Sequence, residues 1–448
     1  MATTKIQLPE VQGPIPETKD SQIHGKHGVD HFNYVIQEYF VTGVADTYES
    51  VSMSDAMDMT KRDNVKDLGR RNFDRPVIQK EVPYTTRLLI YRPKDNKKFS
   101  GNVIIEPFHP IYGGIMATWG NDNFYHMEHG DIQVGVQHPS TFAGMKKFNK
   151  DRYAPLNMPD FTQLWGCLAQ VGALMKSRDK RNPLLGLAVT YQFMTGLSYT
   201  GVATATFANY HHATAKLPDG KNIFDGYVPI NNAMYNRPLD VPVIRIMSMG
   251  DYASFGGLNN RREDSDAPGS KYRMYELAGA PHTTVWQRRR GMAKFPGALT
   301  MRDMGAPRQL TDRPRFAENE KPNDFPLGIF FAGAFQNLFD WVRGINIPPK
   351  GDRIATNADG STKVDEHGNP VGGIRSPYVD VPIATYNSRE LMGYKIPFTV
   401  EKKKKLYGSQ AKYVDKVAKA TEILVKERWI PASEASEIFD TAKASEPF

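Results

Sequence analysis

The chain has 448 residues, of which 40% are hydrophobic, and its formal net charge is +8. This length fits about two to four domains, or one large domain with insertions, and the apolar content excludes a wholly disordered chain. Cys167 is the single cysteine, so a disulfide framework within the chain and a zinc site built from cysteines are both excluded.

The first 30 residues are rich in Pro, Gly and His, and we expect them to form an extended arm. They hold no apolar stretch of signal-peptide length. The most apolar longer segment, residues 325–342, is short for a membrane span and is interrupted by Gln336, Asn337 and Asp340. It predicts a buried helix, so we expect no membrane partner and a cytoplasmic location.

Short runs of apolar and β-branched residues alternate with helical stretches along residues 34–277. Residues 166–177 are apolar at helical spacing, and a charge-free segment of small residues after Ser198 predicts a second buried helix. Strands alternating with helices indicate βαβ units, and therefore an α/β fold class with a mostly parallel sheet flanked by helices. The strands are predicted at residues 34–42, 84–91, 102–106, 132–136, 187–193, 226–230, 241–247 and 272–277.

Residues 191–206 carry the pattern of a nucleophile elbow, in which a serine lies on a sharp turn between a strand and a helix. Gly196 lies two residues before Ser198. Thr200 stands where the second glycine of Gly-x-Ser-x-Gly is usual, and Gly201 follows one residue later. Small residues around the serine let the strand and the helix approach each other. An ordinary Gly-Ser turn is the alternative interpretation.

A serine nucleophile needs a base, and the base needs a carboxylate that orients it. Asp251 follows the predicted strand 241–247, and His282 follows the predicted strand 272–277. Each separation along the chain leaves room for about one βα unit, in the Ser–Asp–His order of α/β-hydrolases. The pattern therefore predicts Ser198 as nucleophile, His282 as base and Asp251 as acid. The nearby alternatives for the acid are Asp225, Asp264 and Asp266.

Two backbone N–H groups are expected to stabilise the oxyanion that develops when a serine attacks a carbonyl carbon. One is that of Tyr199, the residue after the nucleophile. The other is expected in the loop after strand 102–106, where Phe108 and His109 are the best candidates because the neighbouring prolines lack an N–H group. A plain loop without a donor role is the alternative.

A late segment, residues 372–382, reads Gly-Gly-Ile-Arg-Ser-Pro-Tyr-Val-Asp-Val-Pro. With this motif and the segments 272–282 and 340–349, the chain resembles an α/β-hydrolase of the family labelled only "alpha/beta hydrolase domain". The resemblance covers roughly residues 80–395 and implies a serine esterase-like fold with Ser198 as nucleophile and His282 as base. Members often carry an acidic residue two positions before the aspartate, where this chain has Met249.

Within the late motif, Arg375 and Asp380 are suited to pair with each other. We infer that the motif braces the rim of the active site. The chain then divides into an extended N-terminal arm, an α/β-hydrolase catalytic domain and a C-terminal helical extension with an amphipathic helix at 410–428. The boundaries are predicted at residues 1–30, 31–395 and 396–448, with loop insertions at 284–325 and 350–380.

No cofactor and no metal are expected. His126 and His129 lack the spacing of a zinc-binding His-Glu-x-x-His helix, so a solvated helix end or turn is the better interpretation. No glycine-rich segment lies between a predicted strand and a helix in the way a dinucleotide site requires. The lysine run 402–405 favours a solvated helix face or a turn, so no nucleic-acid partner is expected.

We expect a serine hydrolase that cleaves a small-molecule carboxylic ester through an acyl-enzyme. An acyltransferase or a lactonase with the same triad is one alternative, and a catalytically silent binding protein of the same fold is another. The pattern leaves open a homo-oligomer.

Two features suggest the character of the ester. Residues 287–315 hold eight Lys or Arg and two Asp, so this loop can steer an anionic substrate, although a solvated loop without that role is the alternative. Aromatic loop residues can line an apolar pocket, although ordinary core positions are the alternative for most of them. These aromatic residues are Trp119, Phe124, Tyr125, Phe142, Tyr252, Phe255 and Trp286.

Overall fold

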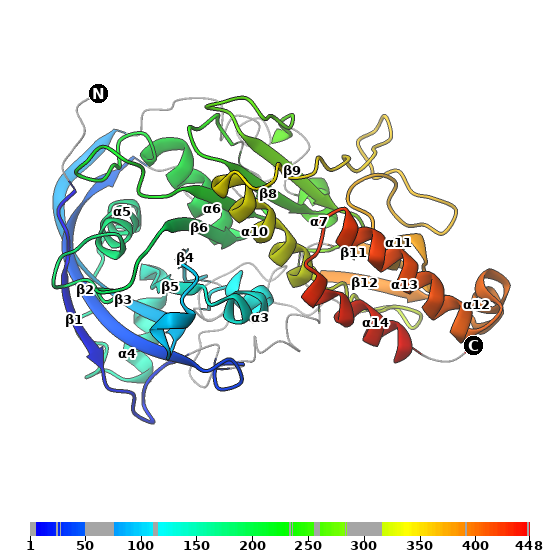
Figure 1. The fold of residues 1–448 in the computed structure, drawn as a ribbon, viewed down its shortest axis with the longest axis horizontal. Helices are drawn as coiled ribbons and strands as arrows, with labels where there is room; N and C mark the ends of the chain where they lie inside the picture. Colours follow the sequence, from blue (N-terminus) through cyan, green and yellow to red (C-terminus); the bar gives the residue numbers. More distant parts are fainter. Residues whose placement is uncertain are drawn as a thin grey trace.

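A nine-stranded sheet runs through the molecule (Figure 1). The computed structural model describes residues 6–23, 26, 28–49, 76–110, 115–232, 234, 236–254, 260–282, 284, 316–389, 392–445 and 448. In spatial order the strands are β1 (Glu10–Ile15), β2 (Tyr34–Tyr48), β3 (Val77–Pro93), β5 (Ile132–Val136), β4 (Asn102–Pro107), β6 (Tyr191–Leu197), β7 (Gly226–Ile230), β8 (Val243–Ser248) and β9 (Tyr272–Leu277).

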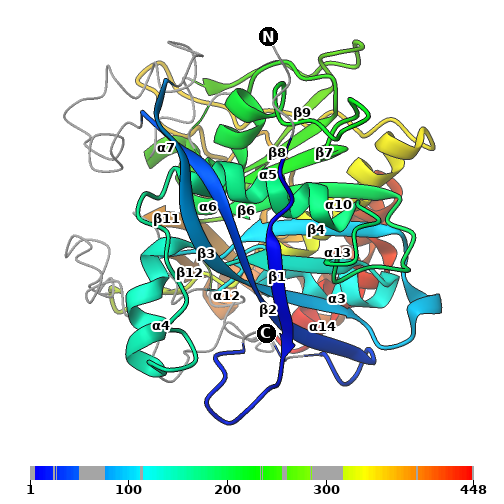
Figure 2. The ribbon, with the colours of Figure 1, turned by 90° about the vertical axis from the view of Figure 1, so that its left-hand side faces the viewer.

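The sheet is parallel from β5 to β9 and antiparallel at its β1 edge. Strands β5, β4, β6, β7, β8 and β9 pair in parallel, whereas β1, β2 and β3 extend the sheet through antiparallel pairs. Figure 2 shows these three blue strands crossing the side of the molecule that faces the viewer. The predicted α/β fold with a mostly parallel sheet is confirmed.

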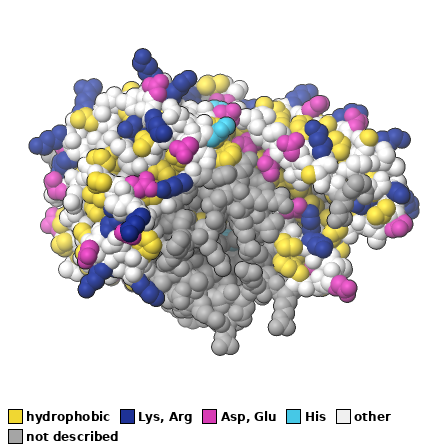
Figure 3. All heavy atoms as spheres, turned by 90° about the horizontal axis from the view of Figure 1, so that it is seen from below, with side chains coloured by type: hydrophobic (Ala, Val, Ile, Leu, Met, Phe, Trp, Pro, Cys, Tyr) yellow, Lys and Arg dark blue, Asp and Glu magenta, His cyan; other side chains and the backbone are white. Residues whose placement is uncertain are grey.

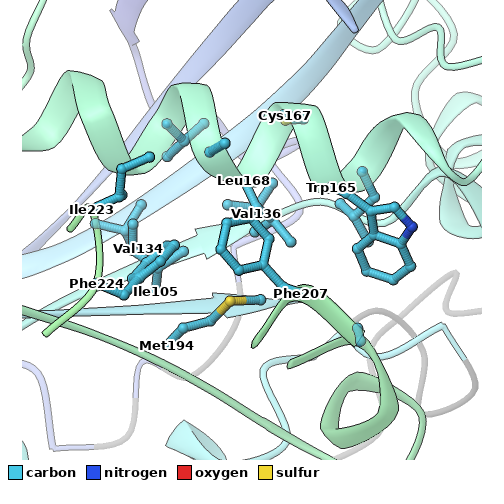
Figure 4. Packing of buried hydrophobic residues seen from close by; sticks show 14 of the residues in the cluster. Ile105, Val134, Val136, Trp165, Cys167, Leu168, Met194, Phe207, Ile223 and Phe224 are labelled. Carbon is cyan, nitrogen blue, oxygen red and sulfur yellow. The ribbon is translucent and has the colours of Figure 1, made fainter. Parts of the chain in front are cut away.

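Both faces of the parallel strands are buried. Because successive side chains of a strand point to opposite faces of the sheet, neighbouring residues join different hydrophobic clusters. Val103 and Ile105 of β4 join one hydrophobic cluster, and Ile104 joins another. The first cluster includes most of α5 (Gln163–Met175) and Ala203 of α6 (Tyr199–Thr206). Figure 4 shows Leu168 of α5 packed over strand side chains in this cluster. Full burial of such a side chain stabilises the fold by about 1.5–3 kcal/mol.

The second cluster lies under α10 (Leu327–Arg343) and α3 (Trp119–His129). Helix α10 coincides with the predicted buried helix at 325–342, and nearly all of its apolar residues are enclosed. Among the described helices, none combines the length and the apolar character that a membrane crossing requires.

A three-stranded sheet, made of one short strand before α10 and two strands after it, lies with several helices at one end of the molecule (Figure 1). Helix α13 buries Tyr413, Val417 and Leu424 in the second cluster. The helical stripe predicted at 410–428 is therefore confirmed. The domain boundaries stay predictions. The elements are β10 (Lys321–Pro322), β11 (Ala384–Arg389), β12 (Met392–Pro397), α12 (Val400–Tyr407), α13 (Gln410–Lys426) and α14 (Ala435–Lys443).

Three strands have the predicted bounds, namely β5, β7 and β9. Strand β6 differs, because it begins at Tyr191 rather than at residue 187 and continues to Leu197. Its start pairs with the start of β4 and its end pairs with Ile230 of β7. The neighbouring strands, rather than the local apolar run, therefore set its bounds.

Positive and negative side chains are interspersed over the described part of the face in Figure 3. Its dark blue Lys and Arg side chains alternate with magenta Asp and Glu side chains. The basic loop predicted at 287–315 lies outside the described residues, so the proposed steering of an anion stays a prediction.

Candidate active site

Ser198 lies at the junction of β6 and α6 with a backbone conformation that few side chains adopt. Its φ is 61° and its ψ is −118°. A positive φ in a residue other than glycine costs about 1–3 kcal/mol and is concentrated at functional sites. The Ser198 N–H donates to the carbonyl of Ile230 at 3.0 Å, which ties the turn to the end of β7.

The two glycines around Ser198 are required by close backbone contacts. A Cβ on Gly196 would lie 2.2 Å from the carbonyl oxygen of Thr200, and a Cβ on Gly201 would lie 2.2 Å from that of Ile230. Thr200 is buried, and its hydroxyl both accepts from the N–H of Leu197 and donates to the carbonyl of Leu197, each at 3.0 Å. Thr200 therefore replaces the usual glycine by bonding back onto the turn.

Gly201→Ala should lower the free energy of unfolding by about 1–3 kcal/mol or more, because the added methyl group meets a backbone carbonyl that has no room to move. Gly220→Ala is the control, since a Cβ there meets nothing within 4 Å and only its φ of +82° opposes the change. Urea denaturation of both variants measures the difference. Equal stability of the two variants would show that the close approach at Gly201 is relaxed in solution.

Asp251 and His282 meet at the carboxyl ends of β8 and β9. Asp251 lies in the short helix α7 (Met249–Ser254), directly after β8. Its Oδ1 lies 2.5 Å from Nδ1 of His282, and the two side chains are 1% and 2% exposed. Strand β7 lies between β6 and β8 in the sheet. This buried pair and Ser198 therefore lie at the same end of the parallel strands, the carboxyl end.

The alternative acids are engaged elsewhere. Asp264 accepts from Arg353 at 2.8 Å and from the N–H of Met274 at 3.0 Å. Asp266 pairs with Arg273 at 2.5 Å. The third alternative, Asp225, pairs with the lysine at the C-terminal end of α5. Of the four predicted candidates, the structure brings Asp251 against His282.

Two residues that the sequence pattern did not single out support Asp251. The Ser248 hydroxyl donates to Oδ2 of Asp251, and the Ser248 N–H donates to Oδ1 of Asn231 at 2.8 Å. Asn231 has a φ of 47°, which asparagine tolerates better than most residues. The only signal in the sequence was that each polar residue ends a buried apolar strand.

The two amides predicted as the second oxyanion donor are used within the fold. The N–H of Phe108 donates to the carbonyl of Val136 at 2.8 Å, and the N–H of His109 donates to the carbonyl of Ile115 at 2.6 Å. In this structure neither amide points to an external acceptor. Tyr199 begins α6, and the first N–H groups of a helix have no partner within the helix, so its predicted donor role is compatible with this geometry.

Two histidine rings lie near the ring of Tyr199. The ring centres of His138 and His109 lie 5.1 and 6.3 Å from that of Tyr199. Burial lowers the pKa of His138 to about 3, and burial together with the neighbouring His282 and His138 holds the pKa of His109 well below its usual value. Both rings are therefore neutral at pH 7. The sequence pattern did not identify His138, although it closely follows a buried strand.

The late motif lies against the segment that leads to His282. Ile374 donates its N–H to the carbonyl of Glu276 at 2.7 Å and accepts from the N–H of Ala278 at 3.1 Å. The predicted pairing of Arg375 with Asp380 is confirmed, with Nε 2.5 Å from the carboxylate. These contacts support the inference that the motif braces this rim of the site.

His126 is the clearest difference from the expected positions. It was predicted at a solvated turn, but it is 1% exposed and lies 2.8 Å from Asp131 and 3.6 Å from Asp122. Although burial opposes the charge, these two carboxylates raise its pKa to about 9. It is a buried cation in the fold, and no group of metal-ligating residues was found among the described residues.

The aromatic residues suggested for a pocket belong in part to the core. Trp119, Tyr125 and Phe142 are each members of a buried hydrophobic cluster. Phe255 and Trp286 lie outside the described residues, as does the Tyr252 side chain. For Trp119, Tyr125 and Phe142, the structure therefore supports the alternative interpretation, which is core packing.

Comparison with known proteins gives one family and a set of distant folds. The model of a family described as "Alpha/beta hydrolase domain" matches residues 11–440. A search of curated proteins gave no match. One similar solved structure is a poly(3-hydroxybutyrate) depolymerase from Bordetella parapertussis, with 14% identity over 40% of this chain and 66% of that chain, at a TM-score of 0.26.

Two further solved structures are similarly distant. A protein described as a dienelactone hydrolase from Klebsiella pneumoniae subsp. pneumoniae has 12% identity over 48% of this chain and 88% of its own, at a TM-score of 0.28. A rice cell wall degrading esterase from Xanthomonas oryzae has 10% identity over 45% of this chain and 43% of its own, at a TM-score of 0.23. The chain thus spans less than half the length of that esterase and about two thirds of the depolymerase.

Proposed function

We propose that this chain, which belongs to the alpha/beta hydrolase domain family, is a serine hydrolase that cleaves a carboxylic ester with Ser198, His282 and Asp251. The family match agrees with the resemblance inferred from residues 372–382 and supports the hydrolase class. The observation that carries the proposal is the buried pair of Asp251 and His282, 2.5 Å apart, at the same sheet edge as the strained turn of Ser198.

The pair supports Nε2 of His282 as the nitrogen that acts as the base. An ionised carboxylate only accepts hydrogen bonds, so Nδ1 of His282 carries the proton that it donates to Asp251. Nε2 is then left with a lone pair. As Ser198 Oγ bonds to the carbonyl carbon, Nε2 takes the hydroxyl proton and the carbonyl electron pair moves to oxygen.

The remaining steps return the enzyme to its starting state. The tetrahedral intermediate collapses, the C–O bond to the alcohol breaks, and the alcohol leaves with the proton from Nε2. Water then attacks the acyl-enzyme with His282 again as base. The bond between Ser198 Oγ and the acyl carbon breaks, Oγ takes the proton from Nε2, and the carboxylic acid departs. Asp251 stabilises the imidazolium throughout without taking the proton.

Steady-state and stopped-flow assays with p-nitrophenyl acetate and butyrate test this function. We expect a burst of p-nitrophenol matching the number of active sites, and an acylated Ser198 peptide after acid quenching. A folded protein that gives neither the burst nor turnover with any ester of a chain-length series would contradict ester hydrolysis. Transfer of the acyl group to an added alcohol in preference to water would instead identify the predicted acyltransferase.

Ser248→Ala should lower kcat about 10- to 100-fold, because a hydrogen bond to a charged group contributes about 1.5–3 kcal/mol. The variant removes the contact of the Ser248 hydroxyl with the Asp251 carboxylate and leaves the contact with His282. Ser248→Thr keeps the hydroxyl and should retain most of the activity. If both variants lose activity equally while their melting temperatures stay the same, the hydroxyl is not what positions Asp251.

The ester itself is proposed to be small or medium in size. The proposals that it is anionic or aromatic, that the protein acts in the cytoplasm and that it forms a homo-oligomer rest on the sequence pattern alone.

A further inference from the structure

His138 lies beside the turn that carries Ser198. It is the second residue after β5, and it is 0% exposed. Its ring stands at 89° to the ring of Tyr199, with 5.1 Å between the ring centres. Because Tyr199 directly follows Ser198, this contact brings the His138 imidazole to the nucleophile end of α6.

A hydrogen bond fixes the position of the His138 proton. The N–H of Ser140 donates to Nδ1 of His138 at 3.2 Å. A nitrogen that accepts a hydrogen bond carries no proton, so the neutral ring has its proton on Nε2. Burial lowers the pKa of this ring to about 3, so at pH 7 His138 stays a neutral donor in a single tautomer.

That donor is not used within the described part of the fold. Nε2 of His138 is buried and has no hydrogen-bond partner there. Leaving such a group unpaired costs about 1–3 kcal/mol, and the rare cases in native proteins call for an explanation such as a ligand or a catalytic role. A substrate oxygen would satisfy the group.

In the described part of the loop after β4, residues 108–110, both candidate donors for the second oxyanion contact are already used. The amides of Phe108 and His109, expected to supply the second oxyanion contact, donate to backbone carbonyls instead. We propose that Nε2–H of His138 supplies that contact, and that it donates a hydrogen bond to the ester carbonyl oxygen together with the N–H of Tyr199. This inference rests on the proposed ester hydrolysis at Ser198.

The role needs no proton transfer to or from His138. When Ser198 attacks, the carbonyl oxygen gains the electron pair and a negative charge, and the Nε2–H bond points a fixed dipole at it. When the intermediate collapses, the electron pair returns to the carbonyl bond. The proton stays on Nε2, while His282 alone carries the proton from the nucleophile to the leaving alcohol.

His138→Phe removes the donor and keeps a ring of similar size, whereas His138→Gln keeps an N–H donor and serves as the matched variant. We expect His138→Phe to lower kcat about 100-fold or more with KM little changed, since one oxyanion donor is worth about that much. The affinity for phenylboronic acid, which forms a tetrahedral adduct on a serine, should fall in parallel. The kcat of His138→Gln should be at least tenfold higher than that of His138→Phe.

A kcat of His138→Phe within about threefold of the wild type, or a loss confined to KM, would overturn this role. Nitrogen-15 NMR of the imidazole ring gives a test that does not depend on a folded variant, because a proton on Nδ1 rather than Nε2 would also overturn it. Failure of the proposed ester hydrolysis would give a different result from failure of this role of His138. In that case the wild-type protein itself would not react with a fluorophosphonate at Ser198, whereas failure of this inference leaves that reaction intact and equally fast in His138→Phe.

Discussion

Ser198→Ala should lower kcat for ester hydrolysis by about a million-fold, since removing the nucleophile of a serine triad has an effect of that order. The variant loses the Oγ that forms the acyl-enzyme. It keeps the backbone of the turn, the Asp251–His282 pair and the contacts of Gly196 and Gly201. The melting temperature should therefore change little. Titrated kcat values with p-nitrophenyl butyrate, together with thermal melts, measure both quantities.

Ser361→Ala is the matched control, because Ser361 is an exposed serine of the loop 356–362. It should leave kcat unchanged. A Ser198→Ala protein that keeps more than about a tenth of wild-type kcat, with the same melting temperature, would place the nucleophile elsewhere.

Asp251→Asn should lower kcat by about ten thousand-fold at neutral pH. An asparagine amide can donate to Nδ1 of His282, which moves the imidazole proton to Nε2. The base then faces Ser198 with a proton instead of a lone pair. Because Asn has nearly the same shape as Asp, KM and the fold should change far less than kcat.

Asp266→Asn provides the comparison, since Asp266 was a predicted alternative and lies in an ion pair with Arg273. We expect near wild-type kcat for this variant. The reverse outcome, a severe loss with Asp266→Asn and activity with Asp251→Asn, would contradict the assignment of the acid. The same assay conditions serve for both variants.

Local patterns were sufficient to predict the elements that hold the site. Strand β7 is a short apolar run and β9 is a short segment rich in Tyr, Met and Leu, and both end at polar residues or turns, so their bounds follow from composition. The turn at Ser198 was predicted from Gly196 and from the small residues after it. Chain order along a parallel sheet then predicted which aspartate and histidine lie at the same edge.

Contacts between distant segments could not be predicted in this way. The amide of Phe108 continues the pairing of β4 with β5, and that of His109 bonds to Ile115 across a loop, so neither depends on its own sequence context. The same holds for His138, whose tautomer depends on the N–H of Ser140. His126 is buried and pairs with two aspartates, and nothing in the His-x-x-His spacing indicates them.

The substitution of Thr200 for the usual glycine shows how a departure from a motif can be accommodated. A methyl and a hydroxyl group at this position are enclosed, and the hydroxyl makes both of its hydrogen bonds with Leu197. The requirement for a small residue moves to Gly201, where the backbone of Ile230 approaches. The motif is therefore better described by the contacts than by the letters.

The most direct test of Ser198 as the nucleophile is to map the adduct of a fluorophosphonate probe on the folded protein by peptide mass spectrometry. If Ser198 is the nucleophile, a single stoichiometric adduct forms on the peptide that contains Ser198, and none forms in the Ser198→Ala variant. A folded wild-type protein without an adduct, or an adduct on another residue that persists in Ser198→Ala, would contradict the assignment of Ser198 as the nucleophile.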